Sequence, residues 1–421
     1  MIQSVTTAIV AALLAFTVPL HAFGAYAVSL VALAALRAKR KPPEPDESRP
    51  PPRIAVIIVA HDEERVILDS VKSLMAQRYP ADSYAVHVVA DNCTDRTADL
   101  ARSAGASVLE RSGGGPSGKS AAVAFGVSEV EARGVFDAVA VFDADNIADA
   151  DFLTRVAARL TSGERVVQGF VDSKNPGASW VAGSSAIGFW AIAELAQAPR
   201  ERLGLSTPLM GTGFAISLDE ARRLLTTGGA LTDDLDLAAR LAARGIRVAY
   251  EARARTVDEK PTGLRAAVAQ RHRWMQGRWA VAGRHVPELL RVAFGPRKNG
   301  FGARFRSFDV AVQLVAPSLL FTAVAIALLA GTALSHAPHA RFGAPLASWS
   351  LAVAAVYYLV PAAGIARHRP SVRVWLCYLL QPGYLAWSLP LAVSGFVMRR
   401  GERWIRTPKG SGGVAIGKRR D

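Results

Sequence analysis

Residues 138–145 read AVAVFDAD, an apolar run that ends on the two carboxylates Asp143 and Asp145. Two similar runs precede it along the chain, IAVIIVA at Ile54–Ala60 and AVHVVA at 85–90. Runs this short and this apolar are typical of strands that are buried on both faces of a sheet. Helix-like stretches separate the runs, at 63–77, 95–105 and 119–133. This alternation of strand and helix predicts an α/β domain built on a parallel sheet.

Each predicted strand ends at a cluster of polar, mostly acidic residues. The clusters are HDEE at 61–64, DNCTD at 91–95 and DADN at 143–146. Ligands of open α/β sheets bind beyond the carboxyl ends of the strands, so we expect the clusters to meet at one crevice. Asp143 and Asp145 can then both reach a Mg²⁺ or Mn²⁺ ion that neutralises a diphosphate. The second cluster also fits an Asx turn with a helix cap.

Composition favours a membrane protein over a nucleic-acid-binding one. The 421 residues are 51% hydrophobic and carry a formal net charge of +15. No nucleic-acid-binding motif accompanies this charge, and cytosolic Lys and Arg of a membrane protein explain it more simply. Cys93 and Cys377 lie far apart and without metal-ligand spacing, so they indicate neither a disulfide framework nor a zinc site.

Apolar segments near both ends predict attachment to a membrane. A span needs about 20 residues, and residues 5–36 supply them before the basic cluster 37–41. Because basic flanks stay in the cytosol, we expect an inner-membrane protein with a cytosolic catalytic domain. The predicted segments are a membrane segment with its flank (1–41), a Pro-rich linker (42–52), the catalytic domain (53–285), interfacial helices (286–308), a C-terminal membrane region (309–398) and a basic tail (399–421).

Two further motifs follow the predicted metal-binding pair. Residues 232–234 read Thr-Asp-Asp before a predicted helix, and residues 270–274 read Gln-Arg-His-Arg-Trp. Neighbouring carboxylates repel each other, which raises the pKa of one of them and suits it to deprotonate a hydroxyl. Gln270, Arg273 and Trp274 share one helix face, where Arg can pair with a diphosphate and Trp can stack on a sugar. A helix cap and an interfacial helix are the structural alternatives.

A rival function comes from residues 113–120, GGGPSGKS, which match the phosphate-binding pattern of P-loop nucleoside triphosphatases. Two strand–helix units precede this loop, whereas a P-loop normally follows the first strand. The rival also leaves the motifs at 232–234 and 270–274 without a role. We therefore keep it as the alternative of another class.

The order of the Asp143–Asp145 pair, Asp234 and the Gln270–Trp274 motif resembles membrane-integrated family-2 glycosyltransferases. These include cellulose, chitin and hyaluronan synthases and ceramide glucosyltransferases. The resemblance implies a Rossmann-like GT-A fold and transfer, with inversion, of a sugar from a nucleotide sugar such as a UDP-sugar. It implies Asp234 as the base and Asp145, with Asp143, as the ligands of Mg²⁺ or Mn²⁺.

The resemblance also assigns binding residues one by one. It places the nucleotide sugar against Ala60, Glu64, Asp91, Lys119, Asp143 and Arg273, and the acceptor against Gly211, Thr212, Gly213, Gln270 and Trp274. The sequence departs from the family at two motifs. The first loop reads Val-Ala-His-Asp-Glu-Glu where Pro-x-x-Asn-Glu is usual, and Asp233 stands where Glu is usual.

The tail 404–410, WIRTPKG, resembles the gating loop of cellulose synthases, which would bring Lys409 to the nucleotide. A plain basic juxtamembrane tail is the alternative. The gating reading favours processive synthesis and secretion of a polysaccharide. Transfer of one sugar to a membrane lipid, as in ceramide glucosyltransferases, stays open, and the sequence does not identify the sugar.

Overall fold

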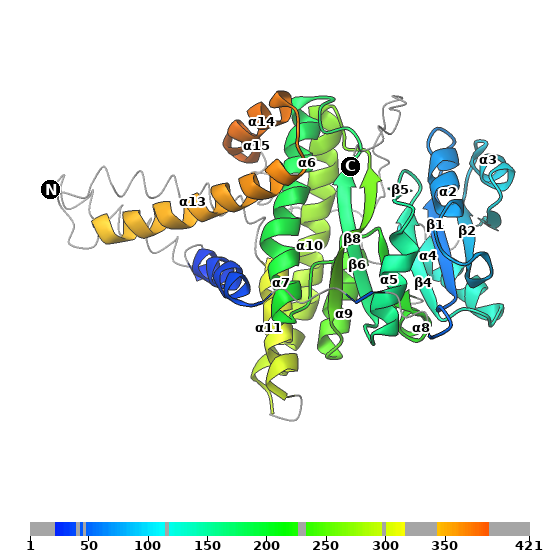
Figure 1. Cartoon of the computed structure of the whole chain (residues 1–421), viewed down its shortest axis with the longest axis horizontal. Helices are drawn as coiled ribbons and strands as arrows, with labels where there is room; N and C mark the ends of the chain where they lie inside the picture. Colours follow the sequence, from blue (N-terminus) through cyan, green and yellow to red (C-terminus); the bar gives the residue numbers. More distant parts are fainter. Residues whose placement is uncertain are drawn as a thin grey trace.

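The computed structural model describes residues 22–38, 43–44, 48–113, 118–225, 233–296, 300–315 and 343–386. Within these residues one sheet contains eight strands in the order β3-β2-β1-β4-β7-β6-β8-β5 (Figure 1). The strands are β1 (Ile54–Ala60), β2 (Tyr84–Asp91), β3 (Ser107–Arg111), β4 (Ala138–Asp143), β5 (Ile147–Ala148), β6 (Val166–Ser173), β7 (Phe214–Ser217) and β8 (Val248–Asp258).

The first half of the sheet is the parallel unit that the sequence predicts. Strand β1 pairs in parallel with β2 and β4, and β2 pairs in parallel with β3. The register sets Ala60 opposite Ala90 and Val59 opposite Asp143. The polar clusters that follow these strands therefore begin at one edge of the sheet, which confirms their predicted convergence.

Helices cover both faces of the sheet. The α-helices are α2 (Ile67–Met75), α3 (Thr97–Ser103), α4 (Lys119–Ala132), α5 (Phe152–Thr161), α6 (Trp180–Ile192), α7 (Ala198–Leu203), α8 (Leu218–Leu224), α9 (Asp233–Ala243), α10 (Leu264–Phe294), α11 (Gly300–Val315), α13 (Gly343–Arg367), α14 (Val372–Leu379) and α15 (Gln381–Ala386). A short 3-10 helix, η1 (Ala81–Ser83), and a short π-helix, η2 (Ala193–Gln197), accompany them. One buried core joins α2, α3 and α5 to the sheet, and a second joins α4, α8 and α9. Successive side chains of a strand point to opposite faces of the sheet, so the apolar residues of the buried strands contribute to both cores.

The longest helix, α10, packs against both α9 and α11 through a third apolar cluster. It runs unbroken across residue 286, where we expected the catalytic domain to give way to interfacial helices, even though Pro287 lies inside it. The first residue of the predicted C-terminal membrane region, Asp309, belongs to α11 and is fully buried. Arg200 of α7 pairs with its carboxylate at 2.8 Å, so this part of α11 is held to the catalytic domain.

The predicted membrane segments are only partly within the described residues. Residues 22–36 form a helix that contacts α11, where the Tyr26 hydroxyl donates to Asp309 at 2.7 Å. Helices α13 and α14 pack on α6, and α13 extends away from the sheet (Figure 1). Among the described helices, none combines the length and the apolar character that a membrane span requires. Residues 1–21, 316–342 and 387–421 lie outside the described part of the chain.

Candidate active site

The Asp143–Asp145 turn follows β4 and is fixed by two hydrogen bonds. The backbone N–H of Asp143 donates to Asn146 Oδ1 at 2.9 Å and to Thr212 Oγ1 at 3.0 Å. The Asp143 side chain stays 40% exposed to the crevice, while Asp145 is buried and accepts from the Glu259 N–H. Two hard oxygen donors at one turn fit a divalent cation such as Mg²⁺ or Mn²⁺.

Lys119 connects this turn to the next loop. It is the first residue of α4, behind Gly118, whose φ of 107° favours glycine. Its ammonium group forms an ion pair with Asp143 and donates to the Gly211 carbonyl at 2.7 Å. The negative charge of Asp143 is therefore paired with one positive charge, that of Lys119. Lys119, the lysine of the P-loop-like motif, thus follows β3 in the chain and lies next to the predicted metal ligand Asp143.

The loop 211–213 is held between β4 and β6. The Gly213 N–H donates to Val141 O at 2.9 Å, and Gly213 O accepts from the Gly169 N–H at 2.8 Å. Gly213 has a φ of 61°, and a Cβ there would meet Thr256 Cγ2 at 2.6 Å, so only glycine fits. The loop consequently presents the Gly211 backbone to the crevice in a fixed position.

Asp234 faces this loop from the first turn of α9. A Cβ placed on Gly211 would lie 3.6 Å from Asp234 Oδ2. Burial raises the pKa of Asp234, while the N–H of Leu235 and the charges of Lys119 and Arg278 oppose that rise. A carboxylate with a raised pKa is a stronger proton acceptor than an exposed one. Of the predicted motif, Thr232 and the side chain of Asp233 lie outside the described residues.

Helix α10 carries the predicted Gln-x-x-Arg-Trp motif on one face. Burial lowers the pKa of Arg273 and the charge of Asp143 opposes this, so the guanidinium lies close enough to Asp143 for their charges to interact. Gln270 and Trp274 line a pocket between α6 and α10, and the Trp274 ring lies 6.4 Å from that of Phe189. Helix α10 therefore contributes side chains both near Asp143 and to a polar and aromatic pocket.

Arg278 is a site residue that the sequence did not single out. It lies one turn beyond Trp274 on α10, and its charge acts on Asp234. Its Nη1 donates to the carbonyl of Gln313 at 2.7 Å, which fixes the guanidinium at the end of α11. Only the packing of α9, α10 and α11 creates this arrangement, so no local pattern indicates it.

Lys260 and Asp258 are two further residues that the sequence did not single out, because no strand was predicted over residues 251–258. Strand β8 instead continues to Asp258. Residues 251–256, EARART, alternate polar and apolar side chains, and this period-two signal would have extended the strand. The Lys260 ammonium lies 2.5 Å from the Asp258 carboxylate and 3.1 Å above the Phe189 ring.

The predicted nucleoside side lies at the ends of β1 and β2. Asp91 is buried and pairs with Arg111 of β3 at 2.5 Å. The Ala60 carbonyl accepts from the Cys93 thiol at 3.5 Å, and the Glu64 carboxylate lies 3.5 Å from Arg96. The structure thus brings these three predicted residues to one rim of the crevice.

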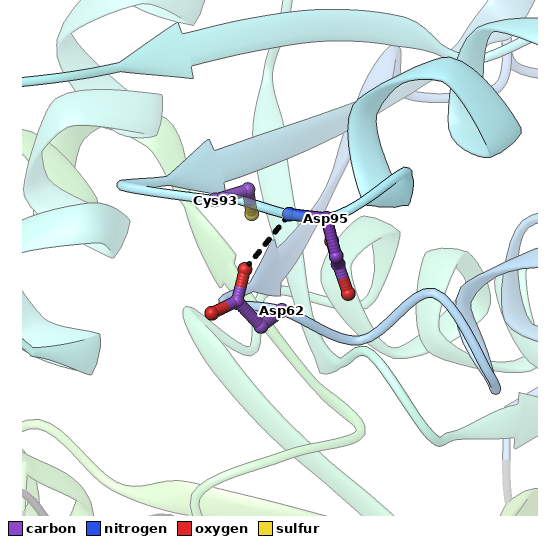
Figure 2. A group of neighbouring side chains, drawn as sticks. All are labelled: Asp62, Cys93 and Asp95. Carbon is purple, nitrogen blue, oxygen red and sulfur yellow. Dashed lines mark hydrogen bonds between the residues drawn. The ribbon is translucent and has the colours of Figure 1, made fainter.

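Asp62, Cys93 and Asp95 form a compact group at this rim, drawn in Figure 2. Asp62 has a φ of 53° and its carboxylate accepts from the backbone N–H groups of Thr94 at 2.6 Å and Asp95 at 3.2 Å. Asp95 accepts from the Thr97 N–H at 2.9 Å, which is the Asx turn that the sequence predicts, whereas the N-cap position of α3 is held by Arg96 without a side-chain hydrogen bond. The two carboxylates fasten the β1 loop to the β2 loop, so these hydrogen bonds account for the group without a metal ion.

Comparison with known proteins gives a consistent picture. The sequence model of the family described as "Glycosyltransferase like family 2" matches residues 51–277. A protein of Synechocystis named beta-monoglucosyldiacylglycerol synthase is 31% identical over 277 residues, which are 60% of this chain and 54% of that protein. The Bacillus subtilis protein named "Probable glycosyltransferase YdaM" is 26% identical over 263 residues, 57% of this chain and 59% of its own length. The chain thus spans little more than half the length of these relatives.

A solved structure shares the fold. The mannosyltransferase PcManGT of Pyrobaculum calidifontis, in complex with GDP-Man and Mn²⁺, superposes with a TM-score of 0.57 at 19% identity. The similarity covers 93% of this chain and 98% of that one. It therefore includes the helices around the sheet as well as the sheet itself.

Proposed function

The chain belongs to glycosyltransferase-like family 2, and from that premise we propose an inverting transfer of one sugar from a UDP-sugar to a hydroxyl group of a membrane lipid. The observation that carries this proposal is the position of Asp234. Its carboxylate lies beside Gly211, whose carbonyl accepts from Lys119, and Lys119 pairs with Asp143. The predicted base Asp234, the cation Lys119 and the predicted metal ligand Asp143 are therefore connected by successive contacts.

These contacts suggest the following chemistry. The acceptor hydroxyl gives its proton to Asp234 as its oxygen forms a bond to the anomeric carbon, and the bond from that carbon to the diphosphate breaks. The attack comes from the side opposite the leaving group, so the anomeric configuration inverts. Lys119 and Arg273 stabilise the negative charge that develops on the departing diphosphate. When bound at Asp143 and Asp145, Mg²⁺ or Mn²⁺ would supply further charge neutralisation.

The donor assignment rests on the rim formed by Ala60, Glu64 and Asp91. A buried carboxylate held by one arginine, as Asp91 is by Arg111, can still accept from the N–H group of a uracil ring. The relative in complex with GDP-Man carries a different base. The identity of the nucleotide is therefore part of the proposal and part of its test.

The acceptor assignment favours a lipid over a polysaccharide. The 31% identical relative is named for a product built on diacylglycerol. The argument for a processive polymer synthase depends on the gating-loop resemblance at 404–410, and Lys409 lies outside the described residues. A lipid acceptor also suits an inner-membrane enzyme whose active site faces the cytosol, which the apolar terminal segments and the charge of +15 support.

The test uses the full chain in detergent micelles with radiolabelled UDP-glucose, UDP-galactose and GDP-mannose, each with Mg²⁺, Mn²⁺ or EDTA. We expect label from a UDP-sugar in the chloroform extract, only with metal and not with Asp234→Asn. Label in an ethanol-insoluble polymer would establish the polysaccharide synthase instead. ATP hydrolysis without any sugar transfer would overturn the proposal in favour of the P-loop alternative.

A further inference from the structure

The buried face of α10 that packs on α9 and α11 contains a polar residue to which the proposed reaction assigns no role. The buried residues beyond Arg278 follow it by three, four, seven, eleven and fifteen positions, so they share one side of the helix. They are Val281, Ala282, His285, Leu289 and Ala293. His285 is 7% exposed and its four companions are apolar. Because a polar group is costly to bury without a hydrogen bond, the partner of His285 is informative.

That partner is Asp236 in the first turn of α9. His285 Nε2 lies 2.8 Å from Asp236 Oδ1, and since a carboxylate accepts, this nitrogen carries the hydrogen and donates it. Asp236 is also 7% exposed, and its Oδ2 lies 2.8 Å from Nε of Arg240. Arg240 belongs to α9 itself, so its contact does not tie α9 to α10. Arg284 of α10 is 66% exposed and lies 3.7 Å from Oδ1, where water screens its charge.

A buried polar pair inside an apolar contact fixes how two helices align. The apolar part of the contact, in which Val281 and Leu289 meet Ala239 of α9, is non-directional and tolerates a shift of one helix along the other. Such a shift would separate His285 from Asp236 and leave the imidazole buried without its acceptor, at the cost of its desolvation. The pair therefore selects one alignment of α9 on α10.

The selected alignment also determines where the proposed base lies. Asp234 precedes Asp236 by two residues on α9, and Arg278 precedes His285 by seven residues, about two helical turns, on α10. In this alignment the charge of Arg278 acts on Asp234, and the Asp234 carboxylate lies beside Gly211. A change of alignment would move the carboxylate relative to both its cation and the loop that borders the crevice.

We propose that His285 is a positioning residue for the reaction: through Asp236 it holds the first turn of α9 in the alignment that places Asp234 for proton transfer. The inference rests on the proposed function, in which Asp234 is the base. His285 acts through Asp236 and touches neither substrate. Its contribution therefore enters the chemical step and leaves the binding of the nucleotide sugar unaltered.

The experiment compares His285→Asn with His285→Gln in the full chain in detergent micelles, with dioctanoylglycerol and the labelled UDP-sugar that the wild type transfers, UDP-glucose or UDP-galactose. The glutamine Nε2 can take the place of the imidazole Nε2 and reach Asp236, whereas the shorter asparagine cannot. We expect His285→Asn to lower kcat roughly 10- to 100-fold, the scale of a misplacement of about 1 Å, with the KM for the UDP-sugar unchanged. His285→Gln should restore most of kcat.

Leu289→Ala is the matched control, because it removes a fully buried side chain from the same face of α10 and keeps the polar pair. It should lower the free energy of unfolding in urea without lowering kcat, at a temperature where circular dichroism shows every variant folded. Asp236→Ala repeats the test from α9 and decides it if His285→Asn does not fold. It should lower kcat as His285→Asn does, again with an unchanged KM for the UDP-sugar.

The outcomes separate this inference from the function on which it rests. A wild-type kcat in His285→Asn and Asp236→Ala, while Asp234→Asn is inactive, would overturn the positioning role and leave the transferase standing. An equal loss of kcat in Leu289→Ala would also overturn it, because the effect would then belong to packing in general. A wild-type rate in Asp234→Asn, or no sugar transfer by the wild type, would remove both proposals.

Discussion

Replacing Arg278 by Met tests whether Asp234 is the catalytic base without touching the base itself. The change keeps most of the apolar stem and removes the charge that acts on Asp234 from α10. Burial raises the pKa of Asp234 and two cations, Lys119 and Arg278, oppose this. With Arg278 gone, only Lys119 remains, so the pKa of Asp234 must rise further.

The size of the effect follows from one lost neighbouring charge. A nearby opposite charge lowers a carboxyl pKa by about 1 to 3, equivalent to roughly 1.4–4 kcal/mol. A base works only when ionised, so the acidic limb of the plot of kcat/KM against pH should move up by about this amount. The free energy of unfolding also depends on this pKa. A native state that holds the Asp234 proton more tightly than the unfolded state loses stability as the pH rises through the native pKa.

The assay measures sugar transfer between pH 5 and 9 for the wild type, Arg278→Met and Arg278→Lys. We expect Lys to return the limb most of the way, since it restores the charge without the hydrogen bonds to α11. Arg291→Met is the matched control, an exposed arginine on the same helix, and should leave the profile unchanged. An acidic limb that stays in place in Arg278→Met, with activity retained, would show that Asp234 is not the group that titrates.

Three further predictions follow from single contacts. Asp234→Asn should lower kcat by about 10²- to 10⁴-fold while UDP still raises the melting temperature, and a retained rate would remove the residue from its role. Arg200→Met leaves the fully buried Asp309 without its arginine, so denaturant unfolding should show a loss of about 3–5 kcal/mol; a loss below about 1 kcal/mol would mean that water reaches Asp309. Gly213→Ala places a Cβ 2.6 Å from Thr256 Cγ2 at a φ of 61°, and a strained backbone of this kind destabilises by about 1–3 kcal/mol, detectable in the same melts. Thr256→Ser should then recover part of that loss, and no recovery would assign it to backbone strain alone.

The strands and the acidic edge could be predicted from the sequence because their signals are local. A strand buried on both faces, such as Ile54–Ala60, must be apolar at nearly every position, and its burial pattern confirms this. The parallel topology then brings the following polar residues to one edge without any further information. Asp143 and the polar residues that follow β1 and β2 were found in this way.

The residues that tune the site could not be predicted, because long-range packing places them. Arg278 comes near Asp234 only when α10 lies against α9, and Lys260 reaches the Phe189 ring only when β8 ends beside α6. Each is an ordinary basic residue in its local sequence. The boundary at residue 286 was expected because residues 286–306 mix basic and apolar side chains, whereas α10 continues past it and packs against α11.

Helix α10 links three features of the candidate site. Gln270 and Trp274 line the pocket between α6 and α10, Arg273 lies close enough to Asp143 for their charges to interact, and the charge of Arg278 acts on Asp234. From Gln270 to Arg278 the helix rises about 12 Å, so one continuous helix supplies a wall of the pocket, a positive charge near Asp143 and a positive charge near Asp234. A movement of α10 cannot change one of these without changing the others. The pKa of Asp234 therefore depends on the same helix that lines the pocket.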